Sequence, residues 1–554
     1  PGTSTAPAPA APAAAEPLPC VRGVLPNGLR YVVLRHAVPA GRFEAHLELH
    51  VGSVDEAERQ QGMAHMLEHI CFLGSRRRRE LQGAGVGMTS NALTDFQHTV
   101  YHLNLDSGHL VEGLEVLSEV GFGPAFEPAR VEKERAAVLS EAQMVNDCSY
   151  RLTTQIISAF HRENPIHLRF PIGVEGQIAS WTSEELRAFH GSWYVPENAT
   201  LYVVGDLPEE RVVEQVRRTF GGLAASAAPR ADPWQVDSRC LFRPPMPARQ
   251  QVLHAFAGPG TGEPPETGTW NSDLRVSVAT NELMQGMQVC WAAKAPIQAA
   301  ASPGDLVQWL CTRLVVEVVR LRLQMRWCAN AVPCAFHSYD NVREGVAMTT
   351  LTVMTEPSRW FVTCQEVLQE VRAVPRHGIA AEELELSLRM TLGRAADAAH
   401  AQPWAFMGTL QGFDVAATSR EVVEALMAAS PCGHLLTRSE AFSEALRAAS
   451  ERVDLDLLNA TARRLLAPFG CGGEASGTVV VSCPAAMAEE HTGRRVAFPA
   501  PSEEDVRQVL RSTPELSEEE VRSRRVAVPP ALLPQPEPAA AAERRELPGG
   551  VLAL

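Results

Sequence analysis

Apolar and polar residues alternate with two periods along the first part of the chain, and the two periods predict strands and helices in mixed order. The clearest alternation is in FEAHLELHVGS, residues 43–53. Its apolar positions are Ala45, Leu47, Leu49 and Val51, and its polar positions are Glu44, His46, Glu48 and His50. Strict alternation is typical of a strand with one buried face and one solvated face, so we expect a half-buried strand here.

Local signals place the other elements of this first region. Asn27-Gly28 separates two apolar runs and tolerates positive φ, which predicts a hairpin. Thr182 and Glu185 form a capping box that begins a helix running through Phe189. We also expect strands within 89–105 and at 198–207, and helices at 64–75, 109–120 and 128–146. The class is α+β, and the strand at 198–207 is expected to close the unit.

A second region repeats the mixture of helices and strands. We expect helices near 305–326, 359–373, 380–400 and 440–466, and strands near 345–355 and 477–482. The domain boundaries follow from this pattern and from Pro-rich composition. Residues 1–20 are expected to be a disordered Ala/Pro-rich linker, 21–225 a first unit and 226–250 a linker. Residues 251–500 are expected to be a second unit, and 501–545 a charged, Pro/Ala-rich linker that links rather than packs.

The last residues echo the first ordered ones. LPGGV, residues 547–551, is similar to LPNGL, residues 25–29, and each precedes an apolar run. If the echo is a repeat and not a coincidence, residues 546–554 are the start of a truncated third domain.

Composition narrows the class of protein. Hydrophobic residues make up 45% of the 554 residues and charged residues 21%, and no apolar run approaches the ~18 residues of a membrane span, so we expect a globular protein without one. The net charge of -15 argues against nucleic-acid binding and is compatible with a basic partner. The 12 cysteines lack framework spacing, which predicts reduced thiols.

The stretch AHMLEHICFLGS, residues 64–75, carries the strongest chemical signal. Side chains at i and i+4 of a helix are neighbours, so His65 and His69 can converge on one Zn²⁺ ion. Glu68 shares their face but projects to the side, where it can accept a proton from water. The HxxEH order inverts the commoner HExxH. The alternative is a helix whose polar side chains are satisfied within the core.

A catalytic zinc site needs a third protein ligand, and a carboxylate is a usual one. The helix expected at 128–146 offers Glu134 and Glu141, seven residues apart on one face. One of them can reach the metal while the other lies behind it, and the spacing leaves open which. Glu132 is explained by its neighbours Lys133 and Arg135 as part of a solvated face.

These motifs resemble the inverted-zincin, pitrilysin-type metallopeptidase family. HMLEH, then SNALTDFQHTVYH, then ERAAVLSE occur in the family order. The resemblance implies one zinc ion held by His65, His69 and Glu141, with Glu68 as the catalytic base and Glu134 supporting catalysis. It also implies that each unit is a sandwich of an antiparallel sheet and helices.

The same resemblance implies the domain roles. Residues 21–225 are expected to be the catalytic zinc-binding domain and 251–500 a second, non-catalytic pitrilysin-like domain; the two consecutive domains would be half of a four-domain clamshell. In full-length relatives an Arg and a Tyr from the fourth domain help to hold the substrate, and this chain does not contain that domain. Turnover by the chain alone is therefore an open question.

Other polar residues have weaker signals. The segment 90–94 resembles the family's substrate-binding edge strand, which makes Asn91 and Ala92 candidate substrate contacts, although Asn91 could simply end a turn. The run Arg76 to Arg79 is expected to be a solvated loop. Four histidines outside the motif are expected to be structural and not spare ligands: His46, His50, His98 and His102. Cys71 is expected in the core.

A closer likeness within the family points to function. HMLEHICFLGSRRRRELQGAG, RVEKERAAVLSEAQM, RFPIGVEGQI and WYVPENATLYVVGDL resemble its transit-peptide-processing branch. We therefore expect a zinc endopeptidase of the chloroplast stroma that cleaves transit peptides from imported precursors. Its expected partners are unfolded precursors and either the missing C-terminal half or a partner subunit. Nucleic acid is not expected as a partner. The alternatives are a mitochondrial-type processing subunit that acts with a partner chain, and a catalytically impaired precursor-binding half-protein.

Overall fold

The structure is a computed structural model. It describes residues 20–225, 253–258, 268–297, 303–327, 333–341, 345–401, 404–406, 415–416, 418–429, 436–471, 474–488, 495–524, 545–547 and 551–553. The expected linkers at 1–20 and 226–250 fall almost entirely outside the described residues.

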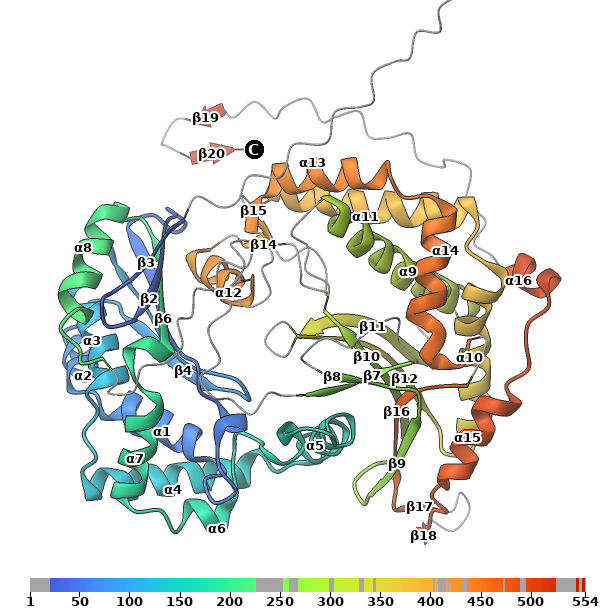
Figure 1. Cartoon of the computed structure of the whole chain (residues 1–554), viewed down its shortest axis with the longest axis horizontal. Helices are drawn as coiled ribbons and strands as arrows, with labels where there is room; N and C mark the ends of the chain where they lie inside the picture. The colour runs from blue at the N-terminus through green and yellow to red at the C-terminus, as the bar shows by residue number, and fades with distance from the viewer. Residues whose placement is uncertain are drawn as a thin grey trace, which may run out of the picture.

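The first unit is a six-stranded sheet with helices packed on one face (Figure 1). Its strands, in spatial order, are β1 (Val21–Val24), β2 (Arg30–Arg35), β6 (Ala199–Gly205), β3 (Arg42–Leu49), β5 (Thr99–Asp106) and β4 (Thr89–Thr94). Its helices are α1 (Met63–Gly74), α2 (Arg76–Gly83), α3 (Leu110–Phe122), α4 (Pro128–Val145), α5 (Cys148–Phe160), α6 (Glu175–Ile178), α7 (Ser183–Trp193) and α8 (Glu209–Phe220). The strand β4 lies at one edge of the sheet.

Alternation in β3 builds the core of this unit. Phe43, Ala45 and Leu47 point to one face, where they are buried against α1 and α3 with Leu67 and Leu114. The hairpin at Asn27-Gly28 pairs β1 with β2, and Gly28 has φ of 88°. The capping box of Thr182 and Glu185 begins α7. The predicted strands and helices of the first unit are confirmed except where noted below.

The second unit has its own sheet and core. Five strands run in the order β11 (Cys334–Asn341), β12 (Val346–Thr355), β10 (Met287–Pro296), β16 (Gly477–Pro484) and β9 (Leu274–Asn281). The helices are α9 (Pro303–Trp327), α10 (Trp360–His377), α11 (Ala381–Ala401), α12 (Ser419–Ala429), α13 (Ser439–Ser450), α14 (Leu455–Leu466), α15 (Glu503–Ser512) and α16 (Glu518–Arg524). Three short two-stranded sheets among the described residues pair β7 (His254–Ala257) with β8 (Gly268–Asn271), β17 (Ala486–Ala488) with β18 (Arg495–Ala497), and β19 (Arg545–Leu547) with β20 (Val551–Ala553). A three-stranded sheet has the order β14 (Val415–Ala416), β13 (Trp404–Phe406) and β15 (Leu436–Arg438).

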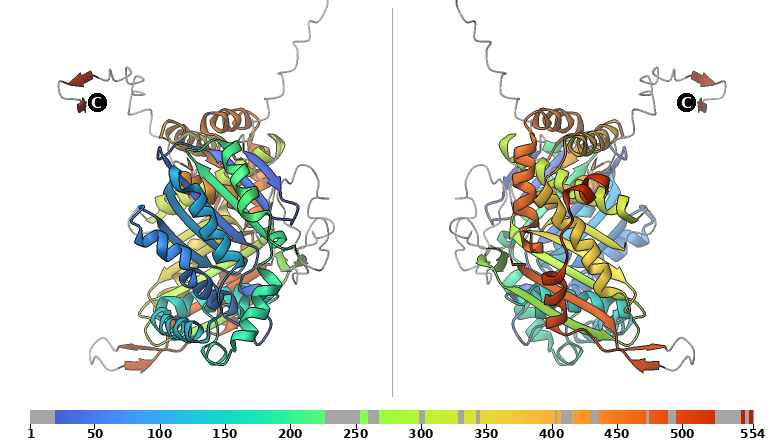
Figure 2. Two further views of the ribbon diagram at one scale, coloured as in Figure 1. Left: turned by 90° about the vertical axis from the view of Figure 1, so that its left-hand side faces the viewer. Right: turned by 90° about the vertical axis from the view of Figure 1, so that its right-hand side faces the viewer.

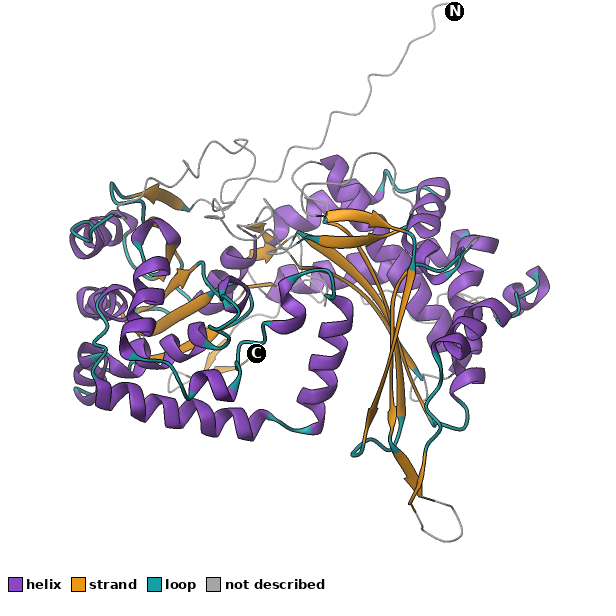
Figure 3. Ribbon diagram, turned by 60° about the horizontal axis from the view of Figure 1, so that its bottom comes forward, coloured by secondary structure: helices purple, strands orange, loops and turns teal. Residues whose placement is uncertain are grey.

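The two sheets turn toward each other and most helices lie on the outer sides (Figures 1 and 2). Two helices cross from one unit to the other. The helix α12 of the second unit packs on the first sheet, where Val422, Val423 and Leu426 meet Val204 of β6. The helix α5 of the first unit rises from the end of α4 toward the second sheet and contacts β9 and β16 (Figure 3).

The contact with α12 corrects the prediction of a half-buried strand. All residues of β3 after Arg42 are buried, so both faces of the strand are covered. The sequence near β3 carries no sign of this cover, because α12 lies more than three hundred residues later in the chain. The strand β6 was expected to close the unit. It lies inside the sheet, between β2 and β3, and the unit continues after it with α8.

The arginine run is helical and not a loop, although Arg76, Arg77 and Arg79 are exposed as expected. It forms the start of α2, where the Ser75 hydroxyl accepts the Arg78 amide hydrogen at 3.1 Å. Glu119 of α3 accepts the Arg77 amide hydrogen at 2.9 Å, and the Arg78 guanidinium lies 4.1 Å from the centre of the Phe72 ring. The charge pattern alone indicated a loop, but the capping Ser75 and the carboxylate of Glu119 stabilise the first turn of α2.

Two expectations for the second region also differ. The helix expected at 440–466 is two helices, α13 and α14, with Asp454 capping the second. Residues 503–524, expected to link, form α15 and α16, and Val506 and Val509 are buried in the core of the second unit. An amphipathic helix with charges on its outer face has the composition of a linker, so composition misled here. No helix in the described ranges is long and apolar enough to cross a membrane.

Candidate metal centre

The helix α1 brings the two motif histidines together one turn apart. Their rings are 4.8 Å apart between centroids and nearly perpendicular, at 89°. The side chains of His65 and His69 are 11% and 17% exposed, and Leu67 and Ile70 of the same helix are fully buried. The Nδ1 atoms of His65 and His69 are buried without a hydrogen-bond partner, and the Nε2 atoms face Glu141.

The start of α1 is fixed by a buried carboxylate that the sequence analysis did not single out. Glu56 accepts the amide hydrogens of Gly62 at 2.9 Å and Ala64 at 2.8 Å, directly before His65. Burial raises the pKa of Glu56 to about 8, although these two amides act in the opposite direction. An acidic residue that caps from six residues upstream has no short-range sequence signature, because the loop between is irregular.

Glu141 of α4 completes the group. Its Oε2 atom lies 3.7 Å from Nε2 of His65 and 3.3 Å from Nε2 of His69. The side chain of Glu141 is 41% exposed, so this side of the group opens to solvent. Ligands at 2.0–2.2 Å from one tetrahedral ion stand about 3.3 Å apart, and the two carboxylate–imidazole separations lie at or near this value, so the three residues fit Zn²⁺.

Glu134 lies behind the group and not in it. One of its oxygens is 4.0 Å from Nδ1 of His69, and the other accepts a hydrogen bond from Arg130 at 3.0 Å. Arg130 also donates to the carbonyl of Leu73 at 2.7 Å, which ties α4 to the end of α1. Of the two glutamates between which the spacing left a choice, Glu141 faces the two Nε2 atoms and Glu134 does not.

Glu68 lies beside the histidines with a contact that the sequence analysis missed. Its Oε2 atom accepts a hydrogen bond from the Thr94 hydroxyl at 2.9 Å. Burial raises the pKa of Glu68 to about 7, and the hydrogen bond from Thr94 lowers it. Burial also lowers the pKa of His65 to about 4, with a further contribution from His69, which favours the neutral imidazole that a metal requires.

Thr94 is the last residue of β4, and this connects Glu68 with the candidate substrate residues. Asn91 and Ala92 are on β4, which pairs with β5 on one side and is the edge of the sheet on the other. The strand contacts α1. A peptide paired with the outer edge of β4 would therefore reach Thr94 and Glu68 at its end. Cys71 is buried in the core, as predicted.

Two family models match the chain. The model described as "Insulinase (Peptidase family M16)" matches residues 31–170, and the one described as "Peptidase M16 inactive domain" matches residues 180–390.

Curated relatives match a similar region. The chain is 36% identical over 409 residues to "Stromal processing peptidase, chloroplastic" of Oryza sativa subsp. japonica, which covers 66% of this chain and 32% of the relative. It is 37% identical over 410 residues to the protein of the same name from Arabidopsis thaliana, which covers 66% and 31%. The matched region is thus about a third of the length of these relatives.

Solved structures show the same fold at lower identity. The first half of the periplasmic protease PqqL from Escherichia coli superposes with a TM-score of 0.67 at 19% identity, covering 92% of this chain and 97% of that chain. The complete PqqL chain superposes with a TM-score of 0.67, and 50% of it is covered. The fold is therefore that of two consecutive sheet-and-helix domains that make up half of the longer protein.

Proposed function

This chain belongs to peptidase family M16, the pitrilysin-type metallopeptidases, and from that premise we propose that it is a zinc-dependent endopeptidase that cleaves transit peptides from precursor proteins in the chloroplast stroma. The observation that carries the proposal is the meeting of the Glu141 carboxylate with both Nε2 atoms of His65 and His69, at 3.7 and 3.3 Å. The substrate and the compartment are supported by the names of the plant relatives.

His65, His69 and Glu141 would hold the zinc ion. Zinc in such a site acts as a Lewis acid that activates water and polarises a peptide carbonyl. Glu134 and Arg130 would orient His69 from behind, since a carboxylate near the second ring nitrogen stabilises one tautomer and one orientation of an imidazole. The residues 21–225 are then the catalytic domain and 251–500 the non-catalytic one.

Glu68 is the proposed general base. Its buried carboxylate, held at one oxygen by Thr94, would take the proton of the attacking water and pass it to the nitrogen of the departing amine. A pKa raised to about 7 by burial suits a group that must both accept and release a proton near neutral pH.

The edge of β4 is the proposed substrate platform. Backbone hydrogen bonds to an exposed edge hold an extended peptide with little regard to its side chains, which suits cleavage of many different precursors. Asn91 and Ala92 are the proposed contacts. The net charge of -15 would favour basic peptides such as transit peptides.

Glu68→Gln tests the proposed base. We expect the variant to retain one zinc ion at this centre but to cleave a transit-peptide-bearing precursor about 10²–10⁴-fold more slowly than wild type, because general base catalysis contributes that much. Zinc is measured by mass spectrometry of the metal and cleavage by gel. Glu80→Gln, an exposed carboxylate on α2 paired with Arg76, is the control and should leave both unchanged. Cleavage by the Glu68→Gln variant at the wild-type rate would refute the role of Glu68.

A further inference from the structure

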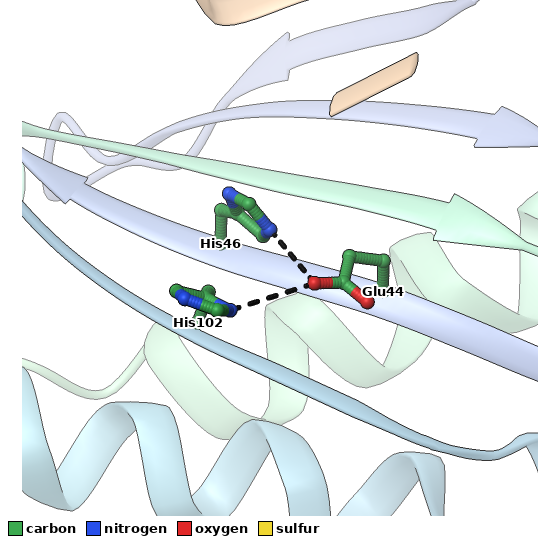
Figure 4. Close-up of side chains that lie close together, drawn as sticks. All are labelled: Glu44, His46 and His102. Carbon is green, nitrogen blue, oxygen red and sulfur yellow. Dashed lines mark hydrogen bonds and ion pairs between the residues drawn. The ribbon is translucent and has the colours of Figure 1, made fainter. Parts of the chain in front are cut away.

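A second cluster of histidines and glutamate lies on the opposite face of the first sheet. Glu44 and His46 of β3 point away from the α1 side of the sheet, and His102 of β5 lies directly across from His46 in the strand register. All three are buried, with 2%, 3% and 7% of their surfaces exposed. Figure 4 shows both imidazole rings beside the Glu44 carboxylate.

The donor atoms of this cluster converge on one oxygen. Oε1 of Glu44 is hydrogen-bonded to Nε2 of His46 at 3.0 Å and lies 3.5 Å from Nδ1 of His102. These separations bracket the distance of about 3.3 Å between ligands of one tetrahedral zinc ion, and one ligand atom from each of the three residues lies within 4.8 Å of the others. The donor set is the same as that of His65, His69 and Glu141.

Neighbouring side chains orient the carboxylate. Asn104, opposite Glu44 in the register, donates from its amide nitrogen to Oε2 at 2.8 Å. Arg42 donates to the amide oxygen of Asn104 at 2.6 Å, which determines the orientation of that amide. Oε2 is thus held by a donor while Oε1 faces the histidines. Supporting hydrogen bonds of this kind hold ligands in metal sites.

The cluster lies at the contact between the two units. The helix α12 packs on β3 and β6, and it carries Arg420 and Glu424, which are paired with each other at 2.9 Å. The charge of Glu424 acts on His46 and that of Arg420 on Glu44. Since Glu424 compensates the charge of Arg420, α12 does not present an unbalanced cation to the cluster.

We propose that Glu44, His46 and His102 form a second zinc site, distinct from the centre on α1 and α4. Two imidazole nitrogens and one carboxylate oxygen are ligands that borderline divalent ions such as Zn²⁺ and Co²⁺ prefer. The bound ion lies between β3 and β5, beneath α12, and stabilises the contact of the first sheet with the second unit. The three buried residues leave one position of a tetrahedral ion to a water molecule, and the place of the ion beneath α12 gives the site a stabilising role.

Zinc counting on separate variants tests the site. The chain is stripped with a chelator, dialysed against zinc chloride and measured by metal mass spectrometry. We expect two zinc ions per wild-type chain. His65→Gln with His69→Gln removes the first centre and should leave one ion. His46→Gln with His102→Asn keeps an amide donor near Glu44 but removes both imidazole ligands, and should also leave one ion. His50→Gln is the matched control and should leave two, because His50 lies on the same face of β3 but hydrogen-bonds Thr200.

The variant without the first centre decides the question even if substitutions in the sheet prevent folding. One zinc ion in the His65→Gln, His69→Gln chain, together with a higher melting temperature when zinc is added, supports the site. No zinc in that chain, or a wild-type chain that holds a single ion, overturns it. The proposed function is judged separately, since it depends on the zinc that the His65 and His69 substitutions remove.

Discussion

Buried ionisable groups have different surroundings in the two units, although both units pack a sheet against helices. In the first, His65 and His69 have buried Nδ1 atoms without hydrogen-bond partners, and their other nitrogens face the partly exposed Glu141. In the second, Arg322 of α9 donates to both oxygens of Glu383 on α11, at 2.7 and 2.8 Å, and the two side chains are 4% and 3% exposed. The Arg322–Glu383 pair is held by its own hydrogen bonds, whereas the Nδ1 atoms of the two imidazoles receive none.

The distribution of candidate metal ligands follows the same division. Within the described residues, both groups of His and Glu side chains that could hold a metal belong to the first unit. Among the described residues, the candidate ligand groups therefore belong to one of two units that share an architecture. Three variants sharpen this comparison.

Breaking the buried pair of the second unit should have the largest effect on stability. Arg322→Met leaves the Glu383 carboxylate buried without its cation, which should lower the free energy of unfolding by about 3–5 kcal/mol. The zinc content should stay that of wild type. Urea denaturation measures the free energy of unfolding, and metal mass spectrometry measures the zinc content.

Arg389→Met is the control for that experiment. Arg389 pairs with Glu385 on the surface of the same helix, α11, where both side chains are more than half exposed. A surface pair contributes about 0–1 kcal/mol, so this variant should unfold close to wild type. Equal losses in the two variants would contradict the distinction between buried and exposed pairs.

The boundary between the units should respond to acid. Glu163, which follows α5, receives hydrogen bonds from Lys294 of β10 at 2.9 Å and Arg275 of β9 at 2.8 Å. Burial acts to raise the pKa of Glu163, but these two cations outweigh it and lower the pKa from 4.5 to about 2. A carboxylate with a lowered pKa stabilises the folded state above its unfolded pKa, and this contribution is lost as the pH falls from about 4.5 toward 2.

The contribution of Glu163 should be about 2–3 kcal/mol at neutral pH. Glu163→Gln should therefore unfold more easily than wild type at pH 7, and the difference should shrink at pH 3. Glu214→Gln, which removes an exposed carboxylate from α8, should show no such change. A difference between Glu163→Gln and wild type that is equal at both pH values would contradict the ion-pair account.

The smallest effect is expected behind the proposed zinc centre. Glu134→Gln leaves Arg130 without its carboxylate and should raise the zinc dissociation constant 10–100-fold, as loss of an orienting group does. Glu132→Gln is the control on the same helix, since Glu132 is exposed and pairs with Arg135 away from the histidines. Competition with a chelating dye measures both. Unchanged affinity in Glu134→Gln would mean that Glu134 only stabilises α4.

Predictions from short-range signals agree well with the structure. The hairpin at Asn27-Gly28 and the capping box of Thr182 and Glu185 involve residues within a few positions of each other, so the sequence carries the whole interaction. The HxxEH motif is of the same kind, since the helix itself brings His65 and His69 side by side. The roles of these side chains as ligands remain predictions.

Features that depend on distant segments did not follow from spacing or composition. The sequence left open the choice between Glu134 and Glu141, because a spacing of seven places both on one face of a helix and says nothing of where that helix docks. Residues 503–524 have the composition of a linker, and only the packing of α15 against α10 shows otherwise.

The sequence by itself determined that two imidazoles and a carboxylate share one helical turn in α1, because the α-helix repeats every 3.6 residues whatever surrounds it. Only the tertiary structure decided which glutamate of α4 meets them, and that Glu44, His46 and His102 are buried together. Those contacts join α1 to α4 and β3 to β5, with α12 closing over the sheet. They depend on the docking of separate elements, and the local pattern of a chain does not encode the direction from which a distant element arrives.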